Sequence, residues 1–237
     1  MTNRISYSLA TLFFFLVSTC VFTLPVLANQ ASQAHLQKDP PEKKLLLNGR
    51  VWIDKHSKAE GDQFFLTDTF LKGSVTFDGR RFDGLDLKYD LLNDELILRP
   101  ESHPIIFMNK EMVDSFRLVY SGRDYIIINA GNDPSGILRG YVNVLYNGES
   151  ALYVKYSKKI YPLAVDGRYD LFVQVQRIYL QRGGELIPVK GKREFLNLLD
   201  DRKKEIRHYI KSNRLRLTGK DAGTFVPVLE YYDSKSK

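Results

Sequence analysis

A period of two in hydrophobic and polar residues dominates the chain from about residue 45 to residue 189. It is clearest in residues 85–89, where Leu, Leu and Tyr alternate with Asp and Lys. Successive side chains of a strand point to opposite faces of a sheet, so the apolar residues share one face and the charged residues the other. Residues 152–156 and 173–176 follow the same pattern. Each stretch predicts a half-buried strand whose charged residues, Lys88 among them, face solvent.

Short turns separate these predicted strands. Residues 78–79 are Asp-Gly, 147–148 are Asn-Gly and 183–184 are Gly-Gly, pairs that tolerate the positive φ angles of tight hairpins. A longer turn-rich segment, 129–140, is predicted to be an exposed loop joining two halves of the sheet. Connections this short leave no room for crossover helices. The predicted fold is a β-rich α+β domain, an antiparallel sheet of hairpins forming a curved sheet or an open barrel, over residues 45–189.

The period changes to that of a helix after residue 189, so residues 190–237 are predicted to be helices packed on the sheet. The apolar positions with this spacing are Phe195, Leu196, Leu198, Leu199, Ile206, Tyr209 and Ile210. Asp200 or Asp201 is a candidate cap for a helix that runs to about residue 213. The apolar patch at 225–232 predicts one more short helix, with Pro227 in its first turn.

The N-terminus has the order of a signal peptide. Arg4 precedes an apolar run over residues 5–27, and Val-Leu-Ala at 26–28 fits a cleavage site after Ala28. A lipoprotein acylated at Cys20 and an uncleaved membrane anchor are the alternatives. Residues 29–44 contain two consecutive prolines and few large apolar residues, which predicts a flexible tether. We therefore expect an exported protein of the periplasm or cell envelope, without a transmembrane segment after cleavage.

The excess positive charge of the chain lies in one segment. Residues 29–189 carry equal numbers of basic and acidic residues, whereas residues 190–216 carry ten basic and four acidic ones. The candidate contacts with an anionic surface are Lys192, Arg193, Arg202, Lys203, Arg207, Lys211 and Arg214. Lipid headgroups or an acidic envelope protein are the expected partners, with a solvated outer helix face as the alternative. Nucleic acid is not expected for an exported protein.

Signals for catalysis are weak. The four histidines are widely separated, and no phosphate-binding loop, nucleophile elbow or zinc-protease motif is present. The acid-rich stretch 90–95 is either an ordinary turn or a calcium-binding loop. Tyr141 and Tyr153 are expected on the strand face opposite Val142, Val144, Leu152 and Val154, where exposed rings form a ligand platform or stabilise the sheet. No cofactor is expected.

Four stretches carry a resemblance that covers most of the chain. They are residues 73–79 (Gly-Ser-Val-Thr-Phe-Asp-Gly), 87–90 (Leu-Lys-Tyr-Asp) with 93–96 (Asn-Asp-Glu-Leu), 140–148 (Gly-Tyr-Val-Asn-Val-Leu-Tyr-Asn-Gly) and 229–233 (Leu-Glu-Tyr-Tyr-Asp). In these the chain resembles a family of uncharacterised exported proteins of Bacteroidota. The resemblance implies an exported bacterial β-rich protein and assigns no functional residue.

Three functions are compatible with these patterns. The absence of catalytic motifs beside a localised basic segment favours a non-enzymatic envelope module that binds a partner or acts as a scaffold. A curved sheet that closes over an apolar ligand or lipid is the second hypothesis. An exported hydrolase without a recognisable motif is the third, because catalytic residues need not be adjacent in sequence.

Overall fold

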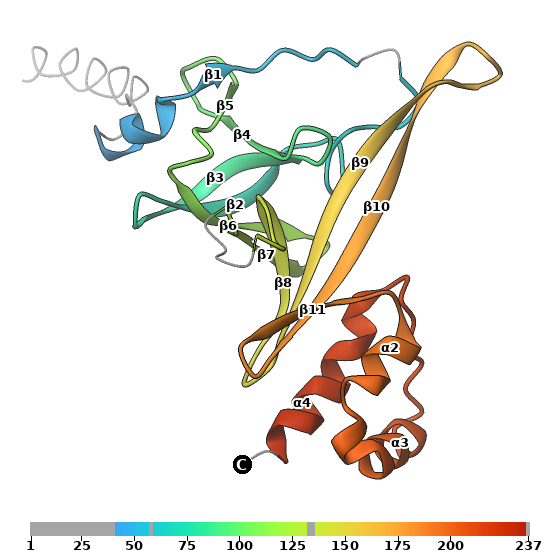
Figure 1. The fold of residues 1–237 in the computed structure, drawn as a ribbon. Helices are drawn as coiled ribbons and strands as arrows, with labels where there is room; N and C mark the ends of the chain where they lie inside the picture. Colours follow the sequence, from blue (N-terminus) through green and yellow to red (C-terminus); the bar gives the residue numbers. More distant parts are fainter. Residues whose placement is uncertain (1–40, 57–58, 132–135, 236–237) are drawn as a thin grey trace, which may run out of the picture. The chain divides into compact units, whose positions relative to one another are not determined.

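The computed structural model describes residues 41–56, 59–131 and 136–235 (Figure 1). Its central feature is one antiparallel sheet in the strand order β1-β5-β4-β3-β2-β6-β7-β8-β9-β10-β11. The strands are β1 Arg50–Val51, β2 Leu71–Phe77, β3 Arg80–Asp90, β4 Glu95–Arg99, β5 Ile106–Phe107, β6 Val113–Tyr120, β7 Arg123–Asn129, β8 Tyr141–Asn147, β9 Ala151–Val165, β10 Tyr169–Arg182 and β11 Glu185–Val189. The two edge strands, β1 and β11, do not pair with each other, so the curved sheet stays open. The predicted fold class is confirmed.

The predicted hairpins form, although one turn differs from expectation. Asp78 and Gly79 have φ angles of 50° and 71°, the left-handed geometry of a tight turn. Gly148 instead begins a wider turn, in which its N–H donates to the carbonyl of Ser150 at 2.8 Å. A Cβ at position 148 would lie 2.2 Å from the Tyr146 hydroxyl, so glycine is needed there for close packing and not for a positive φ.

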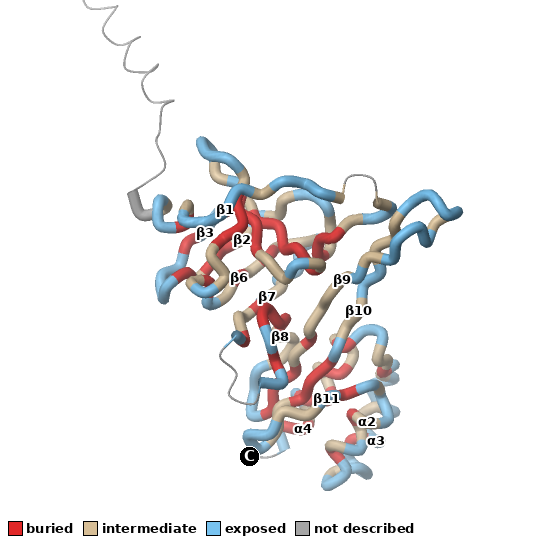
Figure 2. The backbone as a smooth tube through the Cα atoms, turned by 45° about the horizontal axis from the view of Figure 1, so that its top comes forward, coloured by how far each residue is buried: buried red, intermediate tan, exposed pale blue. Residues whose placement is uncertain are grey.

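Aromatic side chains fill the inner side of the curved sheet. Phe116 lies 5.3 Å from Tyr89 and 5.0 Å from Tyr141, measured between ring centroids, and Phe65 lies 4.9 Å from Tyr156. Leu87, Leu96 and other aliphatic residues complete this cluster. Figure 2 shows the buried positions concentrated on β2 and β3 and at the junction of β7 and β8. The contacts of Phe116 with Tyr89 and Tyr141 are edge-to-face, a geometry that stabilises a core beyond the area that it buries.

The expected exposure of Tyr141 is wrong. Its side chain is 1% exposed and belongs to the inner aromatic cluster. Tyr153 is half-buried, and its hydroxyl donates to Gln181 Oε1 at 3.2 Å. Neither ring forms an exposed ligand platform.

The expected common face of Val142, Val144, Leu152 and Val154 is also wrong. Val144 pairs with Tyr153, and the register shifts before Tyr146. Directly paired residues share a face, so Val142 and Val144 lie on the same face as Tyr153 and opposite Val154. Val142 packs on one side with Tyr179, whereas Leu152 and Val154 pack on the other side against the C-terminal helices.

The strands β9 and β10 extend beyond their neighbours as a two-stranded ribbon (Figure 1). Near its tip, Tyr161, Leu163 and Tyr169 are exposed. The ribbon is held at both edges by the rest of the domain: Lys158 N–H donates to the carbonyl of Leu91, and Glu60 bridges to Leu171.

The helical elements are η1 Pro41–Leu47, α2 Lys192–Asn197, η2 Asp200–Arg202, α3 Lys203–Ser212, η3 Ala222–Phe225 and α4 Val226–Ser234. The C-terminal helices cover Leu152 and Leu180 of the sheet, and Phe195 stacks on Phe225 at 4.3 Å between ring centroids. Pro227 lies in the first turn of α4, as predicted. Asp200 and Asp201 do not cap α3, because they form the preceding turn η2 and no side chain caps α3 at its start. Within the described part of the chain, no helix combines the length and apolar character needed to cross a bilayer.

The predictions for the N-terminus lie outside the described residues. They include the signal peptide 1–28, acylation of Cys20 and the tether up to residue 40. Residues 41–44 belong to η1, and Leu46 in that turn is 1% exposed, so ordered structure begins before the expected residue 45.

Candidate functional site

The predicted basic surface is present along one side of α3. Ile206 is buried, and Tyr209 and Ile210 are half-buried on the side of the helix that faces the domain. Lys203, Arg207 and Lys211 recur every four residues and are exposed. Residues at this spacing lie in one row on a helix surface. None of the three cations forms an ion pair with a described residue.

Three of the four remaining predicted basic residues are also exposed. Lys192 and Arg193 begin α2, and Arg214 follows α3. Arg202 differs, because it is half-buried and its Nε lies 4.0 Å from Asp201 Oδ2. Its guanidinium also lies over the ring of Tyr232. Arg202 therefore belongs to a structural contact between η2 and α4, and not to the exposed basic surface.

Asp94 is the centre of a polar network that sequence reasoning missed. Its Oδ1 accepts hydrogen bonds from Tyr89 Oη and Lys155 Nζ, both at 2.6 Å, and its Oδ2 accepts one from Lys110 Nζ at 2.7 Å. Lys155 also donates to the carbonyl of Tyr141 at 2.9 Å. The network ties the turn between β3 and β4 to β8 and β9, so it fixes the curvature of the sheet.

The charges of this network change the pKa values of its members. Burial by itself would raise the pKa of Asp94, but Lys155, Lys110 and the Tyr89 hydroxyl outweigh it, and the pKa lies below its ordinary value. Burial, followed by the negative charge of Asp94, raises the pKa of both Tyr89 and Tyr141. Asp94 is therefore ionised and both tyrosines are protonated at neutral pH.

The acid-rich turn at 90–95 has its carboxylates engaged in hydrogen bonds within the protein. Asp90 is fully buried and accepts hydrogen bonds from Gln63 Nε2 and Asn93 Nδ2 and from the backbone N–H groups of Leu92 and Asn93. The oxygens of Asp94 are taken by lysines and Tyr89. Among the described residues no group of three or more side chains is arranged to hold a metal ion. The ordinary-turn interpretation is the one that fits.

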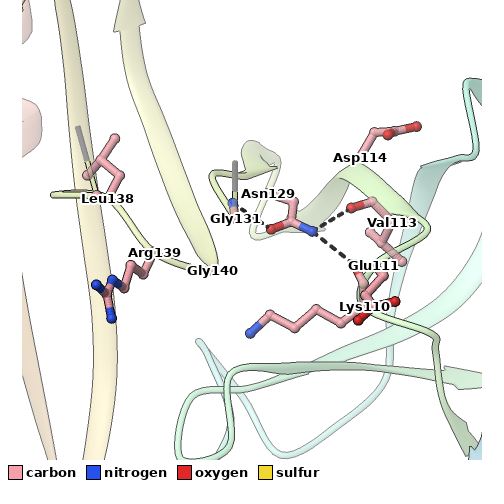
Figure 3. Close-up of a pocket in the computed structure, with 10 residues that line it drawn as sticks. Lys110, Glu111, Val113, Asp114, Asn129, Gly131, Leu138, Arg139 and Gly140 are labelled. Atoms are coloured by element: carbon pink, nitrogen blue, oxygen red, sulfur yellow. Dashed lines mark hydrogen bonds between the residues drawn. The ribbon is translucent and has the colours of Figure 1, made fainter. Parts of the chain in front are cut away.

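A cleft of about 900 Å³ lies beside the Asp94 network. Figure 3 shows Lys110 and Asn129 on one side of it and Leu138 and Arg139 on the other. Asn129 is fixed, because its Nδ2 donates to the carbonyls of Lys110 and Val113 at 2.8 and 2.9 Å. The lining mixes both charge signs, with Lys110 and Arg139 beside Glu111 and Asp114, and its described residues include no histidine.

The predicted solvent exposure of Lys88 is wrong. The residue is 8% exposed, because three aromatic side chains cover this face of β3. Its Nζ lies 4.2 Å from the ring centroid of Phe64, 4.6 Å from that of Phe70 and 5.8 Å from that of Trp52. Burial lowers the pKa of Lys88, although Asp68, Asp54 and Asp62 partly oppose the shift. Alternation along β3 could not reveal this, because the covering residues come from the preceding loop.

Substituting Lys88→Met is expected to stabilise the protein at neutral pH by about 1 kcal/mol, because it replaces a desolvated charge with an apolar side chain of similar length. The folded pKa of Lys88 is below the unfolded value of 10.5, so the penalty is complete below the folded pKa. It is relieved as pH rises through the folded pKa toward 10.5. Urea unfolding at neutral and alkaline pH measures the difference, with Lys159→Met as an exposed control. A clear loss of stability in Lys88→Met would contradict this expectation.

Comparison of the chain with protein-family models, with curated proteins and with solved structures finds no match.

Proposed function

We propose that the protein is an exported, non-enzymatic module of the cell envelope that attaches to an anionic surface through the basic face of α3. The observation that carries this proposal is the exposed row of Lys203, Arg207 and Lys211, without ion-pair partners among the described residues, on a helix whose other side packs on the domain. The predicted signal peptide and the resemblance to exported Bacteroidota proteins support the location.

The chemistry of this face suits a lipid surface that carries negative headgroups. Each basic side chain near such a surface contributes about 1 kcal/mol of attraction. Lys192, Arg193 and Arg214 add exposed positive charge in the same C-terminal region. The binding should weaken as salt rises, because exposed charges are screened beyond about 8–10 Å at physiological ionic strength.

The concave side of the sheet favours this function over transport of an apolar ligand. A carrier needs an empty apolar volume, whereas Phe65, Tyr89, Phe116 and Tyr141 pack against one another there. The C-terminal helices fill the adjoining part of the same side. A packed domain with a charged outer helix is the arrangement of a docking module.

The test is co-sedimentation with lipid vesicles of the chain recovered from cells, after mass spectrometry has identified its N-terminus. The triple variant Lys203→Glu, Arg207→Glu, Lys211→Glu should bind vesicles containing anionic lipid at least about tenfold more weakly than wild type. The control carries Arg80→Glu, Arg123→Glu and Lys159→Glu, three exposed basic residues on strands. Both variants change the net charge equally.

Retention of binding by the control and loss by the α3 variant support the proposal. Equal losses in the two variants would show an effect of net charge and would contradict a specific surface. If wild-type protein does not bind anionic vesicles but binds an acidic envelope protein, the proposal of a lipid partner is wrong.

A further inference from the structure

A small cavity opens beside Lys88 on the outer face of β3. It has a volume of about 200 Å³ and is lined by residues within 52–56 and 59–68, by Lys88 and by Phe172 of β10. Trp52, Phe64 and Phe172 are its aromatic walls, and Gln63, Asp54 and Asp68 are among its polar lining residues. A second cavity of about 190 Å³ shares Trp52, His56 and Gln63 with it. The two cavities are therefore adjacent, and neither is lined by residues of α3.

Two buried polar atoms of this lining have no hydrogen-bond partner. They are the indole N–H of Trp52 and the amide oxygen of Gln63. Gln63 is 5% exposed, and its Nε2 is held by Asp90 Oδ2 at 2.9 Å, so the amide is fixed. A buried polar group without a partner costs roughly 1–3 kcal/mol, so this donor and this acceptor suit a ligand that carries both kinds of group.

The amine of Lys88 is a third unused polar group. No hydrogen bond or ion pair joins it to a described residue, and its nearest neighbours are the rings of Phe64 and Phe70. Of the carboxylates in the lining, Asp62 is paired with Lys158 at 2.9 Å. Among the described residues, only the backbone N–H of His56 donates to the Asp54 carboxylate, and none donates to Asp68. The site therefore offers two donors, Trp52 and Lys88, together with several acceptors.

The charge balance decides between the classes of ligand. Asp62 is neutralised by Lys158, but the carboxylates of Asp54 and Asp68 in the lining form no ion pair with a described residue, so they would repel an anionic ligand. The aromatic rings already surround the cation of Lys88. A neutral molecule with several hydroxyl groups avoids both penalties, because each hydroxyl donates once and accepts twice. The aromatic walls suit the apolar C–H faces of such a molecule.

We propose that this cavity binds a neutral saccharide unit. Its hydroxyl groups would accept hydrogen bonds from Trp52 Nε1 and Lys88 Nζ and donate to Gln63 Oε1 and to the carboxylates of Asp54 and Asp68. The cavity has room for one sugar ring, and Asp54 and Asp68 in its lining are exposed. A terminal sugar unit of a glycan fits this site better than a sugar unit in the middle of the glycan chain.

The test uses the single tryptophan of the chain as a reporter. The indole N–H resonance of the ¹⁵N-labelled protein belongs to Trp52 alone, and it is followed while glucose, galactose, mannose or N-acetylglucosamine is added. At least one of these sugars should shift the resonance saturably. The variant Lys88→Met should bind that sugar about tenfold more weakly, since it loses a charge-assisted hydrogen bond. The exposed Lys159→Met serves as the matched control.

Three results would overturn the proposal. The first is no shift with any of the four sugars, which would show that water alone satisfies the buried groups. The second is a shift with gluconate and with none of the neutral sugars, which would assign an anion site. The third is equal affinity of Lys88→Met and wild type. Because Lys88→Met is expected to remain folded, weaker binding cannot be confused with unfolding, and vesicle binding through α3 should be unchanged.

Discussion

Replacing Asp94 with asparagine is expected to lower the free energy of unfolding by about 3–5 kcal/mol, the cost of leaving partly buried charges without their partner. Lys110 and Lys155 both direct their amines at the Asp94 carboxylate, with side chains 34% and 20% exposed. An amide cannot neutralise either lysine. Asp94 has a φ of 57°, a conformation that asparagine also adopts, so the backbone should not add strain.

The pH dependence of the free energy of unfolding distinguishes loss of the Asp94 charge from a general destabilisation of the fold. The folded pKa of Asp94 is below its unfolded value of 3.8, so the stability that it contributes is complete above pH 3.8. That stability is lost as pH falls through the folded pKa. Denaturant unfolding should therefore show wild type and Asp94→Asn diverging at neutral pH and converging in acid. The control Asp83→Asn, whose partner Arg81 is 60% exposed, should leave the stability nearly unchanged, because solvent screens this ion pair. A neutral-pH loss no larger than that of the control would contradict the structural role of Asp94.

The strand pattern and the hairpins were predictable because their signals are local. Alternation over a few residues identifies a strand, and Asp78 with Gly79 or Gly183 with Gly184 identifies the turn that follows it. Helical spacing likewise predicted α3 and α4, including Pro227 in the first turn of α4. The same helical spacing predicts the exposed row of Lys203, Arg207 and Lys211, because it places the basic and the apolar residues on different faces of α3.

The candidate sites were not predictable in the same way. Lys110 and Lys155 lie 16 and 61 residues from Asp94 in sequence, and no local pattern connects them. Alternation predicts Lys88 on the polar, solvent-facing side of β3, because a period of two residues only separates the two faces of a strand. It cannot show that Trp52, Phe64 and Phe70 cover the polar face. Similarly, the register that places Val144 beside Tyr153 could not be predicted, because alternation within one strand does not give its register against the next.

Asp233 explains why two separate stretches of the resemblance, 140–148 and 229–233, lie together in the fold. Its Oδ2 accepts hydrogen bonds from the Tyr146 hydroxyl at 2.9 Å and the Ser150 N–H at 2.8 Å, and its Oδ1 accepts one from the Ser150 hydroxyl at 2.9 Å. Burial together with Asp233 raises the pKa of Tyr146 to about 12, so this donor stays protonated. The end of α4 is thereby fixed to the β8–β9 turn.

The substitution Asp233→Ala is therefore expected to destabilise the protein by about 3 kcal/mol, because it leaves the Ser150 N–H, the Ser150 hydroxyl and the Tyr146 hydroxyl without their acceptor. Glu230→Ala on the same helix is the matched control, since Glu230 is exposed and should cost less than about 0.5 kcal/mol. Thermal unfolding measures both losses, and hydrogen exchange at Ser150 should accelerate only in Asp233→Ala. If the two variants unfold at the same temperature, Asp233 does not fix α4, and the apolar contacts of Phe225 and Leu229 alone hold the helix on the sheet.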